Sequence, residues 1–452
     1  MDEICISIKY GLYDWQILQQ KDGYADITVG GSYWYDVNEE WGAPTLYCFV
    51  QNENTGAPVP VACESRLSGG KRGTWEAKLR LPTGGLYSLV TRMEWYKDGY
   101  AECICRWYGE ARRHIGVGDV FLIAGQSNAS GTARSMLEDA PDMLVHVFRD
   151  ETHWDIATHP FNQNYSMHSP WLAFAKQLRA ALNDPIGLIQ TARGGSQLAE
   201  WHLSERGGLY RNMLSVVEAS GASPVGVLWY QGCSDTGRDE CETYLARFKE
   251  TVADFREGLK NPTLPFLTCQ LNRFRTLVYG NDASGWNAVR NAQRIAAETI
   301  DGVYVTSTID LNMSDEIHNS RAGNLVLGER VAQLALSVLY GRKDAILAPD
   351  IDTAVYDGDR TVTIGFKNVT TRLGIYYATV EQLPVTVSDG EGEVAVSAYR
   401  IYGNTVVLTL MRPLAENARL SIGEGLCPQI CIYDEETHYP ALCVSDFSIT
   451  RA

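Results

Sequence analysis

From residue 119 to residue 341, short apolar stretches alternate with stretches of helical spacing, and this alternation restricts the possible folds more than any other feature of the chain. The apolar stretches are typical of buried strands; they read VFLIAG, MLVHVF, PIGLIQ, VGVLWYQ, PFLTCQL and VYVTST. Helical patterns between them include SPWLAFAKQLRAAL, ETYLARFKETVADFREGL, GWNAVRNAQRIAAETI and GNLVLGERVAQLALSVLY. Such alternation predicts an α/β domain with a mostly parallel sheet that is covered on both faces.

The segments on either side of this region differ from it in composition and in predicted secondary structure. Residues 1–118 are rich in β-branched and aromatic residues separated by Gly, Asn and Asp clusters, which predicts a β-sandwich-like module. Residues 342–452 return to short β-like stretches such as RTVTIGF and NTVVLTLM. The sequence therefore predicts three parts, 1–118, 119–341 and 342–452. It leaves open whether the last part packs with the first as one module.

Composition excludes several classes of function. A formal net charge of −16 argues against nucleic acid or an anionic membrane surface as the main partner. The eleven cysteines show no paired spacing typical of zinc sites, so we expect free thiols and neither a metal nor another cofactor. The beginning, MDEICISIKYGLYDW, lacks the pattern of a signal peptide. A cytoplasmic location is expected, with a periplasmic or secreted one open if a leader has been removed; the oligomeric state also stays open.

One strand candidate runs directly into a polar turn. The stretch DVFLIAGQSNASG, residues 119–131, ends its apolar run at Gly125 and continues with Gln, Ser and Asn. In open α/β sheets, ligands bind at the carboxyl ends of the strands, where this turn would lie. Ser127 is therefore a candidate nucleophile, and the alternative is an ordinary helix N-cap.

A nucleophilic serine needs a base, and the base needs an orienting group. His318 lies in the stretch DLNMSDEIHNS, which follows the last predicted strand and therefore reaches the same edge of the sheet. Asp315 stands three residues earlier, a spacing that lets its carboxylate reach the δ nitrogen of the imidazole. Together with the turn that carries Ser127, these residues predict a catalytic triad.

Two further turns offer groups that could stabilise an oxyanion. Gly194 and Gly195, in QTARGGSQLAEW, could bring a backbone N–H group close to a reacting carbonyl because no β-carbon blocks the approach. The turn WYQGCSD offers Gly232 and the side chain of Asp235. The prediction of a hydrolase rests on the convergence of these turns with Ser127 and His318.

These motifs resemble the SGNH (GDSL) hydrolase superfamily, and within it the sialate O-acetylesterase and carbohydrate acetylesterase branch. The segment GQSN, residues 125–128, matches the nucleophile block of that branch, and ARGGSQLAEW resembles its glycine block. The segment WYQGCSD resembles its third block, and DEIH matches its terminal Asp-x-x-His. Stretches such as DWQILQQ, GTWEAKLRLPTGGLYSLV and YRIYGNTVVLTL are similar to the β segments around the hydrolase domain in sialate O-acetylesterases.

The resemblance implies a flavodoxin-like three-layer domain between two sandwich-like β segments, acting on acetyl esters of sugars without a metal. Ser127 would attack the acetyl group, with His318 as general base and Asp315 as the group that orients it. The N–H groups of Ser127 and Gly194 would stabilise the oxyanion together with Gly195 or the region of Asp235.

Two positions depart from the branch. Cys233 stands where the branch often has Glu, and Asp235 stands where the superfamily has an oxyanion-donating Asn. Because an ionised Asp can only accept hydrogen bonds, we expect Asp235 to be protonated or turned away from the oxyanion.

Substrate contacts are predicted from residues that flank the four blocks. These candidates are Gln126, Arg193, Trp201, Tyr230, Gln231, Trp286 and Arg290. The two arginines suit the carboxylate of a sialic acid, while core packing is the alternative for the aromatic residues. The expected partner is an acetylated sugar or oligosaccharide, most simply a sialate. An acetylated xylan or another plant polysaccharide is the second candidate, and an inactive carbohydrate-binding protein is the third.

Overall fold

The computed structural model describes most of the 452 residues. The described ranges are 5–37, 41–59, 63–66, 70–96, 102–134, 138–162, 167–275, 282–376 and 379–452. Helices and strands are both present, so the expected mixed α/β class is confirmed. Within these ranges, no helix combines the length and the apolar character needed to span a membrane.

The N-terminal unit is built from β-strands. They are β1 (Ile6–Tyr10), β2 (Ile17–Gln19), β3 (Tyr24–Trp34), β4 (Thr45–Asn52), β5 (Cys63–Arg66), β6 (Arg72–Pro82), β7 (Gly84–Tyr96) and β8 (Cys103–Gly125). Strands β1, β3 and β6 form one antiparallel sheet, and β4, β5, β7 and the first half of β8 form a second. Alternating buried positions, such as those of β6, face a shared apolar core between these two sheets.

The central unit is a sheet with helices on both sides. Its strands are the second half of β8, β9 (Val145–Arg149), β10 (His153–Ile156), β11 (Ile186–Gln190), β12 (Gly226–Tyr230), β13 (Phe266–Cys269) and β14 (Val303–Thr306). Their spatial order is β10-β9-β11-β8-β12-β13-β14. All neighbours pair in parallel except the edge strand β10, which pairs antiparallel with β9. β11 and β12 are buried throughout, as expected for strands covered on both faces.

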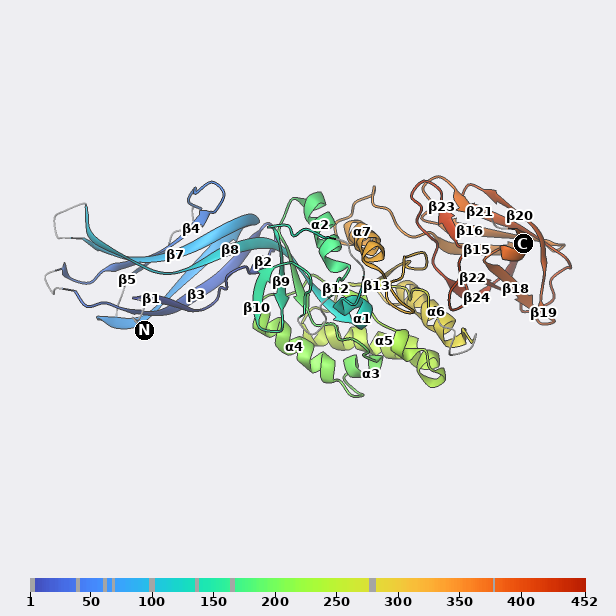
Figure 1. The fold of residues 1–452 in the computed structure, drawn as a ribbon, viewed down its shortest axis with the longest axis horizontal. Coiled ribbons are helices and arrows are strands. Elements are labelled where there is room, and N and C mark those ends of the chain that lie inside the picture. Colours follow the sequence, from blue (N-terminus) through green and yellow to red (C-terminus); the bar gives the residue numbers. More distant parts are fainter. Residues whose placement is uncertain are drawn as a thin grey trace.

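Figure 1 shows α2 and α7 on one side of this sheet and α4 and α5 on the other. The helices are α1 (Ser127–Ser130), α2 (Trp171–Leu182), α3 (Leu198–Trp201), α4 (Gly208–Ser220), α5 (Arg238–Gly258), α6 (Ser284–Thr299) and α7 (Arg321–Val338). α6 packs against α5, and α2 packs against α7. The hydrophobic core of the central unit contains residues that lie between Ile17 and Leu336 in the sequence.

Among its described residues, the C-terminal unit contains strands and one 3-10 turn at Val380–Gln382. Its strands are β15 (Asp350–Tyr356), β16 (Thr361–Lys367), β17 (Leu373–Ile375), β18 (Val385–Asp389), β19 (Gly392–Glu393), β20 (Val396–Tyr402), β21 (Thr405–Leu410), β22 (Arg419–Ile422), β23 (Ile432–Asp434), β24 (Val444–Ser448) and β25 (Thr450–Arg451). They enclose a core of their own. The N-terminal and C-terminal units lie at opposite ends of the molecule in Figure 1, so the two β segments form separate modules.

The predicted boundary at residue 118 falls inside a strand. β8 runs without interruption from Cys103 to Gly125, pairing with β7 in its first half and with β11 and β12 in its second half. The change of composition at residue 119 is therefore a change of environment along one strand, and no linker separates the units there.

Buried polar contacts join the C-terminal unit to the central unit. The side chain of Gln270, which follows β13, accepts from the N–H of Cys443 and donates to its carbonyl, at 2.8 and 2.9 Å. The Arg294 guanidinium on α6 lies 2.6 Å from Asp350 at the start of β15, and both side chains are buried. These contacts fix the position of the C-terminal unit beside the end of the sheet that carries the candidate site.

Candidate active site

The turn after β8 places Ser127 at the carboxyl end of the central strand. Gly125 ends the strand with φ 124°, and a β-carbon there would lie 2.3 Å from the carbonyl oxygen of Tyr230. Only glycine therefore allows β8 and β12 to approach this closely before the chain turns. Gln126 is the N-cap of α1, and Ser127 is the first residue of the helix. The N-cap alternative for Ser127 is thus wrong, and its hydroxyl is not used to cap the helix.

The structure brings the three predicted triad residues together. The Oγ atom of Ser127 lies 3.0 Å from Nε2 of His318, and Nδ1 of His318 lies 2.8 Å from Oδ2 of Asp315. The other carboxylate oxygen of Asp315 accepts from the backbone N–H groups of Ile317 and His318. This order of contacts matches a hydroxyl, a base and an orienting acid.

The environment of Asp315 keeps it ionised. Burial raises the pKa of this carboxyl group, but the hydrogen bonds from the His318 ring and from the two backbone N–H groups outweigh burial. Its pKa therefore lies below the usual value. A carboxylate in this state holds the tautomer of His318 whose Nε2 can accept the proton of Ser127.

Three backbone N–H groups that were predicted as oxyanion donors have no acceptor among the described residues. As the first residue of α1, Ser127 has an N–H group with no acceptor inside the helix. The N–H of Gly194 also donates to no acceptor among the residues that the structure describes. Gly195 adopts φ 74° in the same turn, and its carbonyl accepts from the hydroxyl of Ser234. The N–H of Gly195 donates to no acceptor among the described residues either, so Ser127, Gly194 and Gly195 all remain predicted donors.

Asp235 is turned away from the triad, so its assignment to the oxyanion site is wrong. Its carboxylate is fully buried and accepts from the N–H of Leu198, at the start of α3, and from the Gln231 amide. The Arg247 guanidinium lies 3.5 Å from its other oxygen. Burial raises the pKa of Asp235, although these three partners oppose the shift. Asp235 therefore connects α3, β12 and α5.

Four of the predicted substrate contacts are internal side chains instead. Trp201, Tyr230 and Gln231 are fully buried, and the side chain of Gln126 is 2% exposed. The Trp201 indole donates to Ser196 Oγ and packs against Trp229 in the core. Large side chains at the ends of buried strands and helices face the interior, so their type alone does not place them in a pocket.

Gln126 and Gln231 are used to hold turns together. Oε1 of Gln126 accepts from the N–H of Gly232 at 2.9 Å, which joins the nucleophile turn to the turn after β12. Gln231 donates to Asp235 and accepts from the hydroxyl of Tyr244. No polar group on either side chain is left to face a sugar.

The three remaining candidates have different positions. Arg290 is buried and donates to the carbonyl groups of Leu271, Asn272 and Gly425, so it cannot meet a carboxylate of the substrate. Trp286 is 3% exposed behind Phe274, and its indole N–H donates to Asn272. Arg193 is about half exposed, 3.9 Å from Glu151, and stays a predicted substrate contact.

Asn128 is a functional residue that the sequence analysis did not single out. Its side-chain oxygen accepts from the N–H of Asn319, and its amide donates to the carbonyl of Ile317, both at 3.1 Å. It thus holds the residues on both sides of His318. Its position directly after Ser127 in the segment GQSN could have indicated a role in the site. The residue type did not indicate that it would bond to Ile317 and Asn319.

Asp139, His159 and His168 form a group that could hold a metal ion within the described ranges. The two ring nitrogens lie 3.5 and 3.3 Å from Oδ2 of Asp139, and Lys176 lies 2.8 Å from Oδ1. None of the three residues hydrogen-bonds to the triad in the described part of the chain. The ammonium group of Lys176 forms an ion pair with the carboxylate, and burial lowers the pKa of the His159 ring.

Comparisons with known proteins agree with the geometry. Residues 117–337 match the model of a carbohydrate esterase family described as sialic acid-specific acetylesterase. The structure resembles a carbohydrate acetylesterase from Xanthomonas citri with a TM-score of 0.66 and 21% identity, over 97% of this chain and 98% of that chain. This likeness shows a shared fold. NanS has 17% identity and a TM-score of 0.40, over 50% of this chain and 98% of that chain.

A protein from Arabidopsis thaliana has 25% identity and a TM-score of 0.43, over 49% of this chain and 98% of that chain. No curated protein matches the chain significantly. The family match supports a hydrolase that acts on acetyl esters of carbohydrates. Residues 117–337 of this chain are thus similar to the carbohydrate esterase family of sialic acid-specific acetylesterases.

Proposed function

We propose that this protein removes acetyl groups from sugars through an acyl-serine intermediate. The observation that carries the proposal is the continuous contact from Ser127 Oγ to His318 Nε2 and from His318 Nδ1 to Asp315. His318 takes the hydroxyl proton while Oγ forms a bond to the acetyl carbon. The N–H groups of Ser127 and Gly194 stabilise the negative charge that develops on the carbonyl oxygen.

Collapse of the tetrahedral intermediate breaks the bond between the acetyl carbon and the sugar oxygen. His318 returns its proton to that oxygen, so the sugar leaves as an alcohol and the acetyl group stays on Ser127. His318 then takes a proton from water, whose oxygen attacks the acetyl carbon. The bond between the acetyl carbon and Ser127 Oγ then breaks, His318 returns its proton to Oγ, and acetic acid leaves and ionises to acetate.

The test is acetate release from p-nitrophenyl acetate and from acetylated sugars by the wild type and by Ser127→Ala. We expect the variant to lose at least about 10³-fold in kcat. Ser204→Ala, which removes an exposed hydroxyl, is the matched control and should behave as the wild type does. Hydrolysis that Ser127→Ala leaves unchanged would refute the mechanism.

The sugar itself is the finer part of the proposal. The family description names sialic acid, and the sequence analysis assigned its carboxylate to Arg193 and Arg290. Arg290 is occupied by backbone carbonyl groups, which leaves Arg193 as the remaining partner for a sialate. An acetylated neutral polysaccharide is the second candidate.

A further inference from the structure

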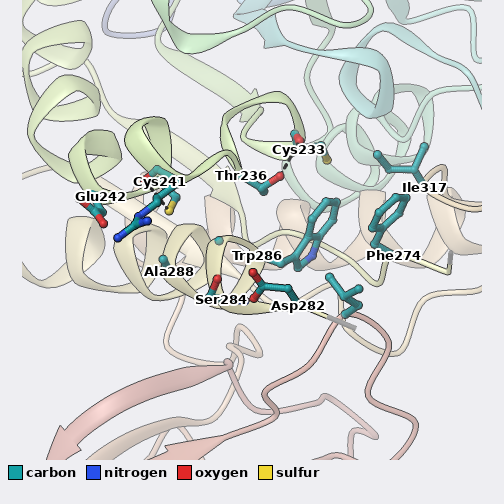
Figure 2. A pocket seen from close by; sticks show the side chains of 13 residues that line it. Cys233, Thr236, Cys241, Glu242, Phe274, Asp282, Ser284, Trp286, Ala288 and Ile317 are labelled. Atoms are coloured by element: carbon teal, nitrogen blue, oxygen red, sulfur yellow. Dashed lines mark hydrogen bonds between the residues drawn. The ribbon is translucent and has the colours of Figure 1, made fainter. Parts of the chain in front are cut away.

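A cleft of about 760 Å³ opens beside the catalytic loop, a volume typical of sites for small organic ligands. Ile317, which lines the cleft, directly precedes His318, and its carbonyl accepts from the side chain of Asn128. Figure 2 shows Phe274 and Ile317 at one end of the cleft, Cys241 and Glu242 at the other, and Trp286 between them. The cleft therefore extends away from the triad over a distance that an acetyl group alone does not fill.

An aromatic surface lies in the part of the cleft nearest the triad. The ring of Phe274 is half-buried and stacks on Trp286 with a centroid distance of 5.1 Å and an interplanar angle of 12°. Trp286 is itself held by the hydrogen bond from its indole N–H to Asn272. Phe274 is thus a ring in a fixed orientation, and fixed rings of this kind pack against the C–H groups on the face of a sugar.

The C-terminal unit supplies a wall of this cleft. Leu426, in the loop between β22 and β23, lines it together with Phe274. The N–H of Phe274 donates to the carbonyl of Leu426 at 2.7 Å, and the buried Arg290 donates to the carbonyl of Gly425 at 2.6 Å. The side chain of Asn287, on α6, accepts from the N–H of Gly425. These contacts hold the loop against the central unit, so the wall is a fixed part of the site.

The charges around the cleft disfavour an anionic sugar. Two carboxylates, Glu242 and Asp282, line it together with one guanidinium, that of Arg238. The N–H of Ser284 donates to Asp282, which lowers the pKa of this carboxyl group and keeps it ionised. The net formal charge of the residues that line the cleft is therefore negative, as is the net charge of the whole chain.

We propose that this cleft binds the sugar portion of an uncharged acetylated oligosaccharide, with Phe274 as the stacking surface and Leu426 as a wall contributed by the C-terminal unit. The inference rests on the proposed acetylesterase activity and names its substrate class. It assigns to the C-terminal unit a direct part in substrate choice.

The first test compares an acetylated xylo-oligosaccharide with O-acetyl sialic acid by the kcat/KM for acetate release. The wild type should prefer the neutral substrate. In the double variant Glu242→Gln/Asp282→Asn, the ratio of sialate to neutral activity should rise about fourfold, because each exposed carboxylate contributes about twofold to repulsion. A wild type that prefers the sialate, or a ratio that stays unchanged in the double variant, would overturn the inference. Loss of sialate activity in Arg238→Met would do the same.

The second test removes the side chains that form the stacking surface and the wall of the cleft. Phe274→Ala and Leu426→Ala should each lower the ratio of oligosaccharide activity to p-nitrophenyl acetate activity about tenfold, since each loses apolar contact that only the sugar makes. Met411→Ala removes an exposed side chain from the C-terminal unit and should keep the wild-type ratio. If Phe274→Ala does not fold, the half-buried Leu426 gives the same test on its own.

Different results would refute the esterase proposal and the substrate inference. If p-nitrophenyl acetate is hydrolysed in a way that requires Ser127, but neither cleft variant changes the ratio, the substrate inference is refuted and the esterase proposal stands. If hydrolysis does not require Ser127, the esterase proposal is refuted and the substrate inference falls with it.

Discussion

At the scale of single residues, His318, the proposed general base, is fixed through its neighbours in the chain. Asn128 bonds to the backbone of Ile317 and of Asn319, and Asn272 donates to the Ile317 carbonyl and to the side chain of Asn319. The imidazole between these anchors needs little reorganisation when charge develops on it. Preorganisation of this kind is a large part of what an active site contributes to rate.

Asp315→Asn tests the orienting role of the carboxylate. The amide can donate to Nδ1 of His318, which favours the tautomer with its proton on Nε2, where it faces Ser127 instead of accepting from it. We expect kcat to fall about 10³-fold or more, with little change in KM. Because the pKa of Asp315 lies below its usual value, lowering the pH from 7 to 5 should leave this carboxylate ionised. A variant that keeps the wild-type kcat at pH 7 would contradict the assignment.

The residues that sequence alone could identify are those whose chemistry is rare. Few side chains can act as a nucleophile, a base or an orienting acid, so Ser127, His318 and Asp315 could be predicted from their positions after predicted strands. Trp201 and Gln231 could not be placed in the same way, because aromatic and amide side chains serve equally in a core and in a pocket. What decides between the two is the direction of the side chain, which follows from packing across the whole unit.

At the scale of elements, α2 is tied to the loop before β9 by one carboxylate. Asp139 is almost completely buried and contacts Lys176 on α2 as well as His159 and His168. Burial raises the pKa of Asp139, but these three partners lower it more, so the pKa lies far below its usual value. The charge is therefore a source of stability at neutral pH.

Asp139→Asn should lower the free energy of unfolding by about 3 kcal/mol at pH 7, because it leaves Lys176 without its buried partner. A carboxylate with a lowered pKa contributes stability above its unfolded-state pKa of about 3.9 and loses that contribution as the pH falls toward the folded-state value. The difference in melting temperature between variant and wild type should therefore be full at pH 7 and should shrink below about pH 4. A difference that grows on acidification would contradict this account. Asp142→Asn, at a partly exposed ion pair, is the matched control and should have a smaller effect.

The sequence predicted the buried strands of the central sheet closely, but it did not predict the edge strand β10. The stretch PIGLIQ predicts a strand at the place of β11, because an unbroken apolar run is typical of a strand covered on both faces. β10, with the sequence HWDI, gave no such signal, because an edge strand of four residues is only partly buried and is specified by its pairing with β9. A predicted domain boundary is misplaced where one strand continues from one environment into another, as β8 does at residue 118.

At the scale of the whole molecule, the C-terminal unit supports the unit that carries the candidate site. Its residues provide the buried partners of Gln270, Arg290 and Arg294. Each of these polar groups would lose hydrogen bonds without it, at a cost of about 1–3 kcal/mol apiece. The central unit is therefore not expected to be stable alone, although it contains the complete triad.

A chain that ends at Gly341 tests whether the central unit is stable without the C-terminal unit. We expect it to be insoluble or to melt at least about 10 °C below the full-length protein, as measured by circular dichroism. The matched control ends at Ile449 and removes only β25, which pairs with β15 over two residues at the edge of the sheet. A truncated chain with the melting temperature of the full protein would show that the interface contributes nothing to folding.

The continuity of β8 has a mechanical consequence. Its 23 residues, at about 3.3 Å each, form an arm of at most about 75 Å that begins in the N-terminal sheets and ends two residues before the nucleophile. A domain on a flexible tether can swing without disturbing its neighbour, but no loop interrupts this arm at the border between the units. A ligand that loads or tilts the N-terminal sheets would therefore act on the same backbone that carries Ser127.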